Sequence, residues 1–298
     1  TKRVTADVLP CKGVGHPWCV QALVRVLLDA GHASIILRSD DEPAIVALKE
    51  RAIAVAKEQH KVDVIPETTP HSDSQSNGLA EVAVRDVKGV ARSLHYDMAK
   101  LHDVDIPREH PILTWMVHYA GSVITRGQLG KDGMTAFQRW KGKRFKGALP
   151  PFAECILYLP AGKRGSKLDE KYVDGIFLGI VERSSEIYVG TAAGVVRGRS
   201  LIRRPPSESS NKELLLAVRG TPWCAVPGSP GIDEVPVIVD AAAVVAEGDL
   251  LAGPGVHVPE ERQLPTRKER GARETRLHGR VSRPQRGSGR TPGTRAPV

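Results

Sequence analysis

The sequence predicts an α/β fold in its first half, followed by a small all-β domain and a disordered C-terminal tail. Three observations support this prediction. Strand-like and helix-like segments alternate up to about Thr125, short β-like runs follow from about Phe145, and the chain ends in a stretch rich in Arg, Gly, Pro, Ser and Thr. Parallel strands need a long crossover connection, which is usually a helix, so the alternation predicts an α/β layer structure. A chain of 298 residues can hold one large domain or two small ones.

The first elements are marked by local signals. The opening segment TKRVTADVLP alternates apolar and polar residues, which is typical of a half-buried strand. A helix is expected from Pro17, with Gly31 as its C-terminal stop. The expected elements after it are the strand SIILRSD, a helix after Pro43, a strand at 62–65 and helices at about 77–101 and 108–125.

The second half has a different pattern. Short β-like runs at 152–159, 175–181, 186–189 and 195–202 are separated by Gly, Ser and Lys, which favours a small barrel or sheet. Residues 205–261 are acidic and rich in Pro, Gly and Ala, with little periodicity, so we expect a linker there. The predicted regions are therefore 1–143 (α/β core), 144–204 (β domain), 205–261 (linker) and 262–298 (tail).

The positive charge of the chain is concentrated in that tail. Residues 262–298 contain eleven Arg or Lys and two acids, an excess that equals the net charge of +9 of the whole chain. Few large apolar residues are present to offset the entropy of ordering this stretch, so we expect it to be disordered. An Arg-rich tail can bind nucleic acid through phosphates, or it can simply be solvated, and composition leaves both open.

The cysteines and the apolar runs narrow the class of protein. The four cysteines contain no CxxC pair, so neither a zinc ribbon nor a disulfide framework is indicated, and reduced thiols are expected. No apolar run approaches the length that spans a bilayer, and the N-terminus has no signal-peptide core. We therefore expect no membrane partner.

Two carboxylates stand where the predicted fold gathers ligands. Asp40 ends the strand SIILRSD, and Glu81 lies near the start of the helix that follows the next strand. Carboxylates brought together in this way can hold Mg²⁺ for phosphoryl transfer. Two simpler interpretations remain open: Asp40 or Asp41 caps the helix that begins near Pro43, and Glu81 favours its own helix N-terminus.

The helix that carries Glu81 also carries a row of bases. Arg85, Lys88 and Arg92 follow Glu81 at steps of three and four, on a different face from the expected buried stripe. That stripe consists of Leu79, Val82, Val87, Val90, Leu94 and Leu101. The basic face can follow a phosphate backbone, or it can be a solvated face with one i,i+4 ion pair.

A second basic cluster surrounds Trp140 and Phe145. Its bases are Arg139, Lys141, Lys143, Arg144 and Lys146. The cluster can grip DNA, with Trp140 stacking on a base, or it can be a solvated junction whose aromatic rings anchor the core.

Two segments resemble the integrase core of retroviruses and retrotransposons, the DDE enzymes of the RNase H-like superfamily. They are RSDDEPAIVAL and TPHSDSQSNGLAEVAVRDVKG, and the second is of the type P-x-S-x-x-N-G-x-x-E, which opens the helix with the last catalytic acid. The residues that carry this likeness are Thr69, Pro70, Ser74, Gln75, Ser76, Asn77, Gly78 and Glu81.

Two later segments resemble copia-type polyproteins. DGMTAFQRWKGK, at 132–143, is similar to the segment that ends copia-type integrase cores. The stretch that begins FAECILYLP is similar to the small SH3-like domain after such cores, with its signature at 167–179. The resemblance implies a three-layer RNase H-like core, truncated at its N-terminus, followed by an SH3-like β domain.

The resemblance also implies roles for the residues singled out above. Asp40 and Glu81 correspond to the second and third metal-binding acids, which hold Mg²⁺ or Mn²⁺. Arg85 and Lys88 match bases that touch the DNA end, and Arg92 and Asn77 extend that nucleic-acid-binding set. The implied partners are the element ends and target DNA in the nucleus, with a homo-oligomer and no small-molecule substrate.

The chain departs from the family pattern at its start. TKRVTADVLPCKG resembles the second strand of the core, so the leading strand with the first catalytic acid is expected outside this chain. Asp7 matches no catalytic position, and no His/Cys zinc segment is present. We therefore predict an integrase fragment whose DNA integration activity is impaired in this chain. A non-catalytic nucleic-acid-binding remnant and an α/β assembly domain are the alternatives.

Overall fold

The computed structural model describes residues 1–68, 78–147, 149–160, 171–184 and 186–229. All of them belong to the first of two units, Thr1–Gly248 and Asp249–Val298. The predicted tail, most of the predicted linker and the motif residues 69–77, including Asn77, lie outside the described residues. None of the described helices is both long and apolar enough to span a bilayer.

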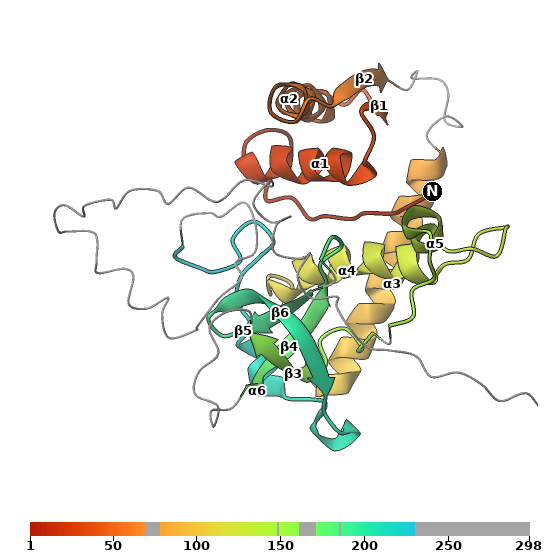
Figure 1. Cartoon of the computed structure of the whole chain (residues 1–298). Coiled ribbons are helices and arrows are strands. Elements are labelled where there is room, and N and C mark those ends of the chain that lie inside the picture. The colour runs from red at the N-terminus through yellow and green to blue at the C-terminus, as the bar shows by residue number, and fades with distance from the viewer. Residues whose placement is uncertain (69–77, 148, 161–170, 185, 230–298) are drawn as a thin grey trace, which may run out of the picture. The chain divides into compact units, whose positions relative to one another are not determined.

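A small parallel α/β layer forms the first part of the described chain (Figure 1). Its elements are α1 (Pro17–Ala30), β1 (Ser34–Ser39), α2 (Pro43–His60) and β2 (Asp63–Thr68). β1 and β2 pair in parallel from Ser34↔Asp63 to Ser39↔Thr68, and α2 is the crossover between them. One face of the two strands packs on the helices through a small core of Leu27, Ala56 and Val64.

Local sequence signals explain where α1 begins and ends. His16 is the N-cap, and its Nδ1 accepts a hydrogen bond from the backbone N–H of Trp18 at 3.1 Å. Pro17 occupies the start of the helix, where its missing N–H is not needed. Gly31 ends the helix in the left-handed conformation, with φ of 71°. The predicted signals at Pro17 and Gly31 are therefore confirmed.

The predicted first strand is wrong. Residues 1–9 form no strand, and Val4 bonds to a helix instead of a neighbouring strand. The N–H of Val4 donates to the Oγ1 of Thr125 at 3.0 Å, and the Thr125 hydroxyl donates to the Val4 carbonyl at 2.8 Å. An ideal Cβ on Gly121 would lie 2.9 Å from the backbone nitrogen of Ala6, so only glycine allows this close approach.

Four strands close into a barrel. They are β3 (Cys155–Pro160), β4 (Val173–Ile180), β5 (Ile187–Thr191) and β6 (Gly194–Arg203), all paired antiparallel around the barrel. Each of the four predicted β-like runs overlaps one of these strands, with ends that differ by up to three residues. Closure leaves no edge strand, which explains why four short strands are sufficient.

The barrel shares its core with two helices, α3 (Gly78–His102) and α4 (Ile112–Gly127). Phe177 in β4 is fully buried and meets Tyr119 of α4 edge to face, with ring centroids 5.6 Å apart. Trp115 of α4 is 2% exposed, and its indole N–H donates to the Gly220 carbonyl at 2.9 Å. A short helix, α5 (Ala136–Lys141), is capped by Thr135 and ends at Gly142.

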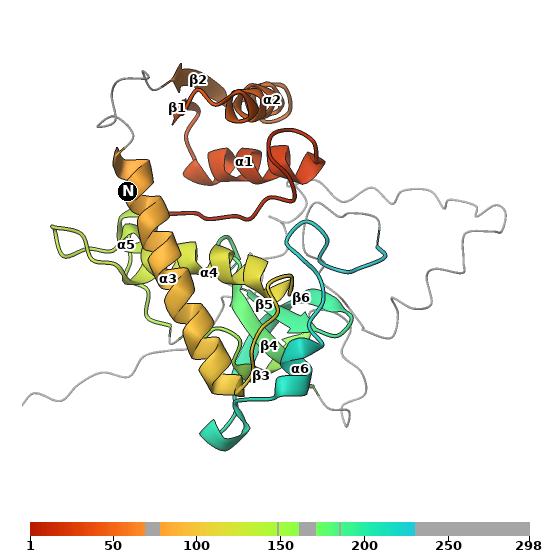
Figure 2. The same ribbon diagram turned by 180° about the vertical axis from the view of Figure 1, so that it is seen from behind.

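The predicted linker is wrong for residues 205–229. This stretch contains a 3₁₀ turn, η1 (Pro206–Glu208), and a helix, α6 (Lys212–Leu216). Leu215 is fully buried and Val218 is 2% exposed in the barrel core. Figure 2 shows α6 beside the barrel at the C-terminal end of α3. Few apolar residues are needed here because they cover an existing core, which explains the weak sequence signal.

Candidate functional site

Asp40, one of the two predicted metal-binding acids, directly follows β1 and is exposed. The N-cap of α2 is Glu42 rather than Asp40 or Asp41, and the Glu42 side chain makes no capping hydrogen bond. Glu42 instead pairs with Lys12. Asp40 therefore stands between the end of a strand and the residue that starts the next helix.

Glu81, the other predicted metal-binding acid, is exposed in the first turn of α3. Ser39 is the register partner of Thr68, so β1 and β2 end at the same edge of the sheet, and Asp40 lies at that edge. Carboxylate oxygens are the ligands that Mg²⁺ prefers, so the chemistry of the two side chains suits this ion. Within the described ranges, no three His, Cys, Asp or Glu side chains are grouped to hold a metal.

The basic row on α3 is exposed, as the helical spacing predicts. Arg85, Lys88 and Arg92 are all exposed, and the Arg85 side chain retains 76% of its accessible surface. Arg85 Nε lies 3.6 Å from Asp86, which also accepts a hydrogen bond from Gln128 at 3.3 Å. An ion pair this long and exposed is weak, so the Arg85 guanidinium remains available to bind an external anion.

The predicted apolar stripe of α3 is buried only toward its C-terminal end. Leu94 packs partly buried against the barrel core, and Met98 and His102 are buried. Leu79 and Val82, in contrast, are 76% and 43% exposed. The prediction is therefore wrong for these two residues, because α4 and the barrel cover only the later turns of the helix. The exposed first half of α3 is thus apolar on one side and basic on another.

The cluster around Trp140 favours the packing interpretation. Arg3 covers the Trp140 ring with its guanidinium 4.1 Å from the ring centroid, and Lys141 lies 3.6 Å from it. Phe145 meets Phe137 edge to face, with centroids 5.5 Å apart. Arg139 is held by Asp132 in an exposed ion pair. The rings of Trp140 and Phe145 are therefore in contact with other side chains of the same chain.

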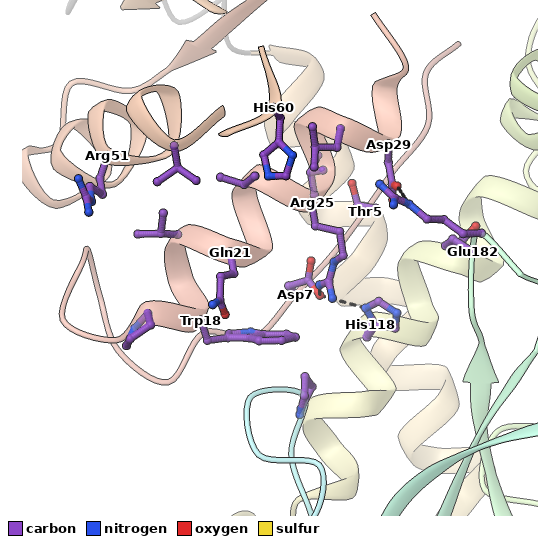
Figure 3. A pocket seen from close by; sticks show the side chains of 18 of the residues that line it. Thr5, Asp7, Trp18, Gln21, Arg25, Asp29, Arg51, His60, His118 and Glu182 are labelled. Atoms are coloured by element: carbon purple, nitrogen blue, oxygen red, sulfur yellow. Dashed lines mark hydrogen bonds and ion pairs between the residues drawn. The ribbon is translucent and has the colours of Figure 1, made fainter. Parts of the chain in front are cut away.

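A pocket of about 1310 Å³ lies between α1, α2, α4 and the loop after β4. Figure 3 shows Asp7 at its centre, between Arg25 of α1 and His118 of α4. Asp7 Oδ1 lies 3.0 Å from His118 Nδ1 and 3.3 Å from Arg25 Nη2. Burial raises the pKa of Asp7, but the hydrogen bond and charge of His118 and the charges of Arg25 and Arg3 outweigh it, so this pKa lies below its usual value.

Further ion pairs line the same pocket. Asp29 accepts from Arg3 at 3.2 Å and pairs with Arg183 at 2.5 Å, and Glu182 accepts from Arg126 at 2.7 Å. Burial raises the pKa of Glu182, but the bonds from Arg126 and from the Ser122 hydroxyl lower it below the usual range. Most charges in the pocket are thus neutralised by one another, and the network joins the α/β layer to the barrel.

Sequence reasoning missed this network. Asp7 and His118 are 111 residues apart, and no local pattern relates them. The segment TKRVTADVLP alternates apolar and polar residues, so the charge of Asp7 gave no sign that this residue would be largely covered and paired. Asp7 matches no catalytic position of the predicted site, and in the structure its carboxylate pairs with His118 and Arg25.

Comparisons with known proteins give a distant likeness at the level of structure. No family model matches the sequence, and no curated protein matches it. Among solved structures, the chain is similar to a chain in the cryo-EM structure of the simian T-cell lymphotropic virus intasome in complex with PP2A regulatory subunit B56 gamma. The identity is 14% and the TM-score 0.29, over 62% of this chain and 63% of that one. With so distant a likeness, function has to be argued from the residues of this chain.

Proposed function

We propose that this chain binds DNA through the exposed first half of α3, as a fragment of an integrase-type phosphoryl transferase. The observation that carries the proposal is the row of Arg85, Lys88 and Arg92, exposed on the helix that Glu81 opens. A helix face with bases at steps of three and four can contact successive phosphates. Sequence motifs add the finer proposal of a copia-type polyprotein fragment with an RNase H-like core and an SH3-like domain.

The proposed chemistry uses Asp40 and Glu81. These two carboxylates would hold Mg²⁺ or Mn²⁺, which in phosphoryl transfer activates the attacking oxygen and stabilises the leaving one. The register of β1 and β2 supports this, because it places Ser39, which precedes Asp40, and Thr68 at the same end of the sheet. Because Asp40 and Glu81 correspond to the second and third acids of the family pattern and Asp7 does not match the first, we propose that end processing and strand transfer belong to the intact polyprotein. The second candidate is a non-catalytic nucleic-acid-binding remnant.

The partners follow from this proposal. They are the DNA ends of the element and the target DNA, in the nucleus, with further copies of the chain in a homo-oligomer. The exposed apolar side of α3, at Leu79 and Val82, is a surface that a further copy of the chain can cover.

DNA binding is tested with two matched triple variants of the full chain. Arg85→Ala/Lys88→Ala/Arg92→Ala should weaken binding to a duplex and reduce the slope of log K against log [salt] by about 2 to 3, since each lost phosphate contact contributes about 0.9. The control Arg51→Ala/Lys57→Ala/Arg108→Ala removes three exposed bases from other elements. It should leave most of the slope intact. Equal losses in both variants would mean that general charge, and not the α3 face, binds DNA.

The chemistry is tested by Mg²⁺- or Mn²⁺-dependent nicking and joining of element-end DNA. The chain alone should show little activity, because two acids bind the metal less tightly than three. Activity that is abolished by Asp40→Asn and by Glu81→Gln would contradict the proposal that integration activity is impaired in this chain. The remnant alternative gains support if adding the upstream coding sequence restores no activity.

A further inference from the structure

Two thiols lie next to each other at the start of α1. Cys11 Sγ is 3.9 Å from Cys19 Sγ, and the Cys19 thiol also lies 3.5 Å from the Cys11 carbonyl oxygen. Cys11 is exposed, whereas Cys19 is fully buried. A disulfide has an S–S distance of about 2.0 Å, so the sulfurs have to approach by about 2 Å.

The chain between the two cysteines can make this movement. Residues 10–16 form bends and turns, and Gly13 has a φ of 77°, which glycine adopts without strain. Cys19 is fixed on the first turn of α1, while Cys11 lies on the loop. A rotation of the Cys11 side chain together with a small loop shift is therefore sufficient.

We propose that Cys11 and Cys19 form an oxidation site, in which a peroxide converts the two thiols to an intramolecular disulfide. The Cys11 thiol loses its proton and its sulfur attacks one peroxide oxygen; the O–O bond breaks, and the departing hydroxide takes up that proton, which gives a sulfenic acid and one molecule of water. The Cys19 sulfur then attacks the Cys11 sulfur, the S–S bond forms while the S–O bond breaks, and the hydroxyl leaves with the Cys19 thiol proton as a second water. Two thiols lose two electrons and two protons to hydrogen peroxide, so the reaction balances.

The order of these steps follows from the two environments. Cys11 is reached by solvent, and a small oxidant meets it first. Burial raises the pKa of the Cys19 thiol, which makes it slow to react with an oxidant in solution. Cys19 is instead held beside Cys11, where it acts as the resolving thiol.

The loop that carries Cys11 contacts the start of α2. Lys12 pairs with Glu42, and an ideal Cβ on Gly13 would lie 3.5 Å from Ala44. Closing the disulfide draws Cys11 toward α1 and shifts these contacts. Glu42 and Ala44 lie just after Asp40, so oxidation alters the backbone next to that acid. This consequence bears on the proposed function, whereas the disulfide itself does not depend on it.

The disulfide is tested by peroxide treatment of the full chain, followed by thiol titration after denaturation and by tryptic mapping without reductant. Free thiols should fall from four to two, as the four cysteines are reduced before treatment. The peptides VTADVLPCK and GVGHPWCVQALVR should appear as one linked species. Cys155 and Cys224 serve as internal controls and should stay reduced.

Two variants test the roles of the thiols. In Cys19→Ser, the Cys11 sulfenic acid should accumulate and be trapped by dimedone. In Cys11→Ser, Cys19 should remain a thiol. A wild-type chain without the linked peptides, or Cys19 that oxidises equally fast in Cys11→Ser, would overturn the proposal.

The coupling to α2 has its own measurement. Amide exchange at residues 42–46 should change at least severalfold between the reduced and oxidised chains, while exchange in β4 and β5 stays the same. A disulfide without this change would refute the coupling, even if DNA binding through α3 holds.

Discussion

The barrel and the α/β layer differ in how their strands are paired and covered. β3 to β6 close on themselves, and their core includes fully buried Phe177, Ile156 and Leu178. β1 and β2 form a sheet of two strands over a core of only three buried residues, and one face of it leaves Ile36 and Ile65 about half exposed or more. Parallel sheets are normally covered on both faces. Within the described residues, every barrel strand thus pairs on both sides, whereas the α/β layer leaves an apolar sheet face exposed.

The difference predicts unequal sensitivity to core truncation. Phe177→Ala empties the centre of the barrel core, so the free energy of unfolding should fall by about 3 to 5 kcal/mol. Val64→Ala, in the core of the layer, should lower it by about 1 to 2 kcal/mol because fewer atoms lose contacts. Urea unfolding measures both, with exposed Ile36→Ala as the control. Equal losses at Phe177 and Val64 would show that the layer is as well packed as the barrel.

The barrel side also contains a pH-dependent anchor. His102 is buried at the end of α3; its Nδ1 accepts from the Asn211 N–H at 3.2 Å, so Nε2 carries the proton and donates to the Ala153 carbonyl at 2.9 Å. Burial lowers the pKa of His102, although the two backbone hydrogen bonds oppose this. Protonation of Nδ1 would break the bond from Asn211.

The sign of the effect follows from the direction of that shift. The unfolded chain binds the proton more tightly, so the stability due to neutral His102 is fully present above about pH 6.5 and is lost as the pH falls through the folded pKa. His102→Gln should remove this part of the pH dependence, measured by urea unfolding at several pH values between 7.5 and 5. Exposed His60→Gln is the control and should keep it. An unchanged slope in His102→Gln would contradict the assignment.

The open layer should cause weak self-association. In the described part of the chain β1 pairs only with β2, and Pro66 in β2 lacks the N–H that an added strand would use. The outer edge of β1 has no such protection. Ile36→Lys, on the β1 edge, should reduce association in sedimentation velocity more than the control Ile65→Lys on the same face. Equal reductions would indicate that the apolar face, and not the β1 edge, drives association.

Local signals predicted much of the fold, and distant contacts explain the rest. Pro17 and Gly31 correctly mark α1, because capping depends on neighbouring residues. The segment at Val4 failed as a strand because its partner, Thr125, lies 121 residues away. The prediction of a linker at residues 205–229 was wrong because their few apolar side chains pack into a core that other elements build.

The candidate site shows the same division. Helical spacing predicts that Arg85, Lys88 and Arg92 share an exposed face, and the structure places them there. Spacing could not show that Leu79 and Val82 would also be exposed, because burial depends on what packs against α3. The roles of Asp40 and Glu81 in metal binding stay predictions.

Amide hydrogen exchange of the full chain, with and without duplex DNA, tests DNA binding through α3 most directly. With DNA at low salt, exchange should slow in residues 78–92 of α3 and stay unchanged in β3 to β6, and the protection should disappear at high salt. Protection of the barrel strands, with none in the first half of α3, would contradict the proposed binding face.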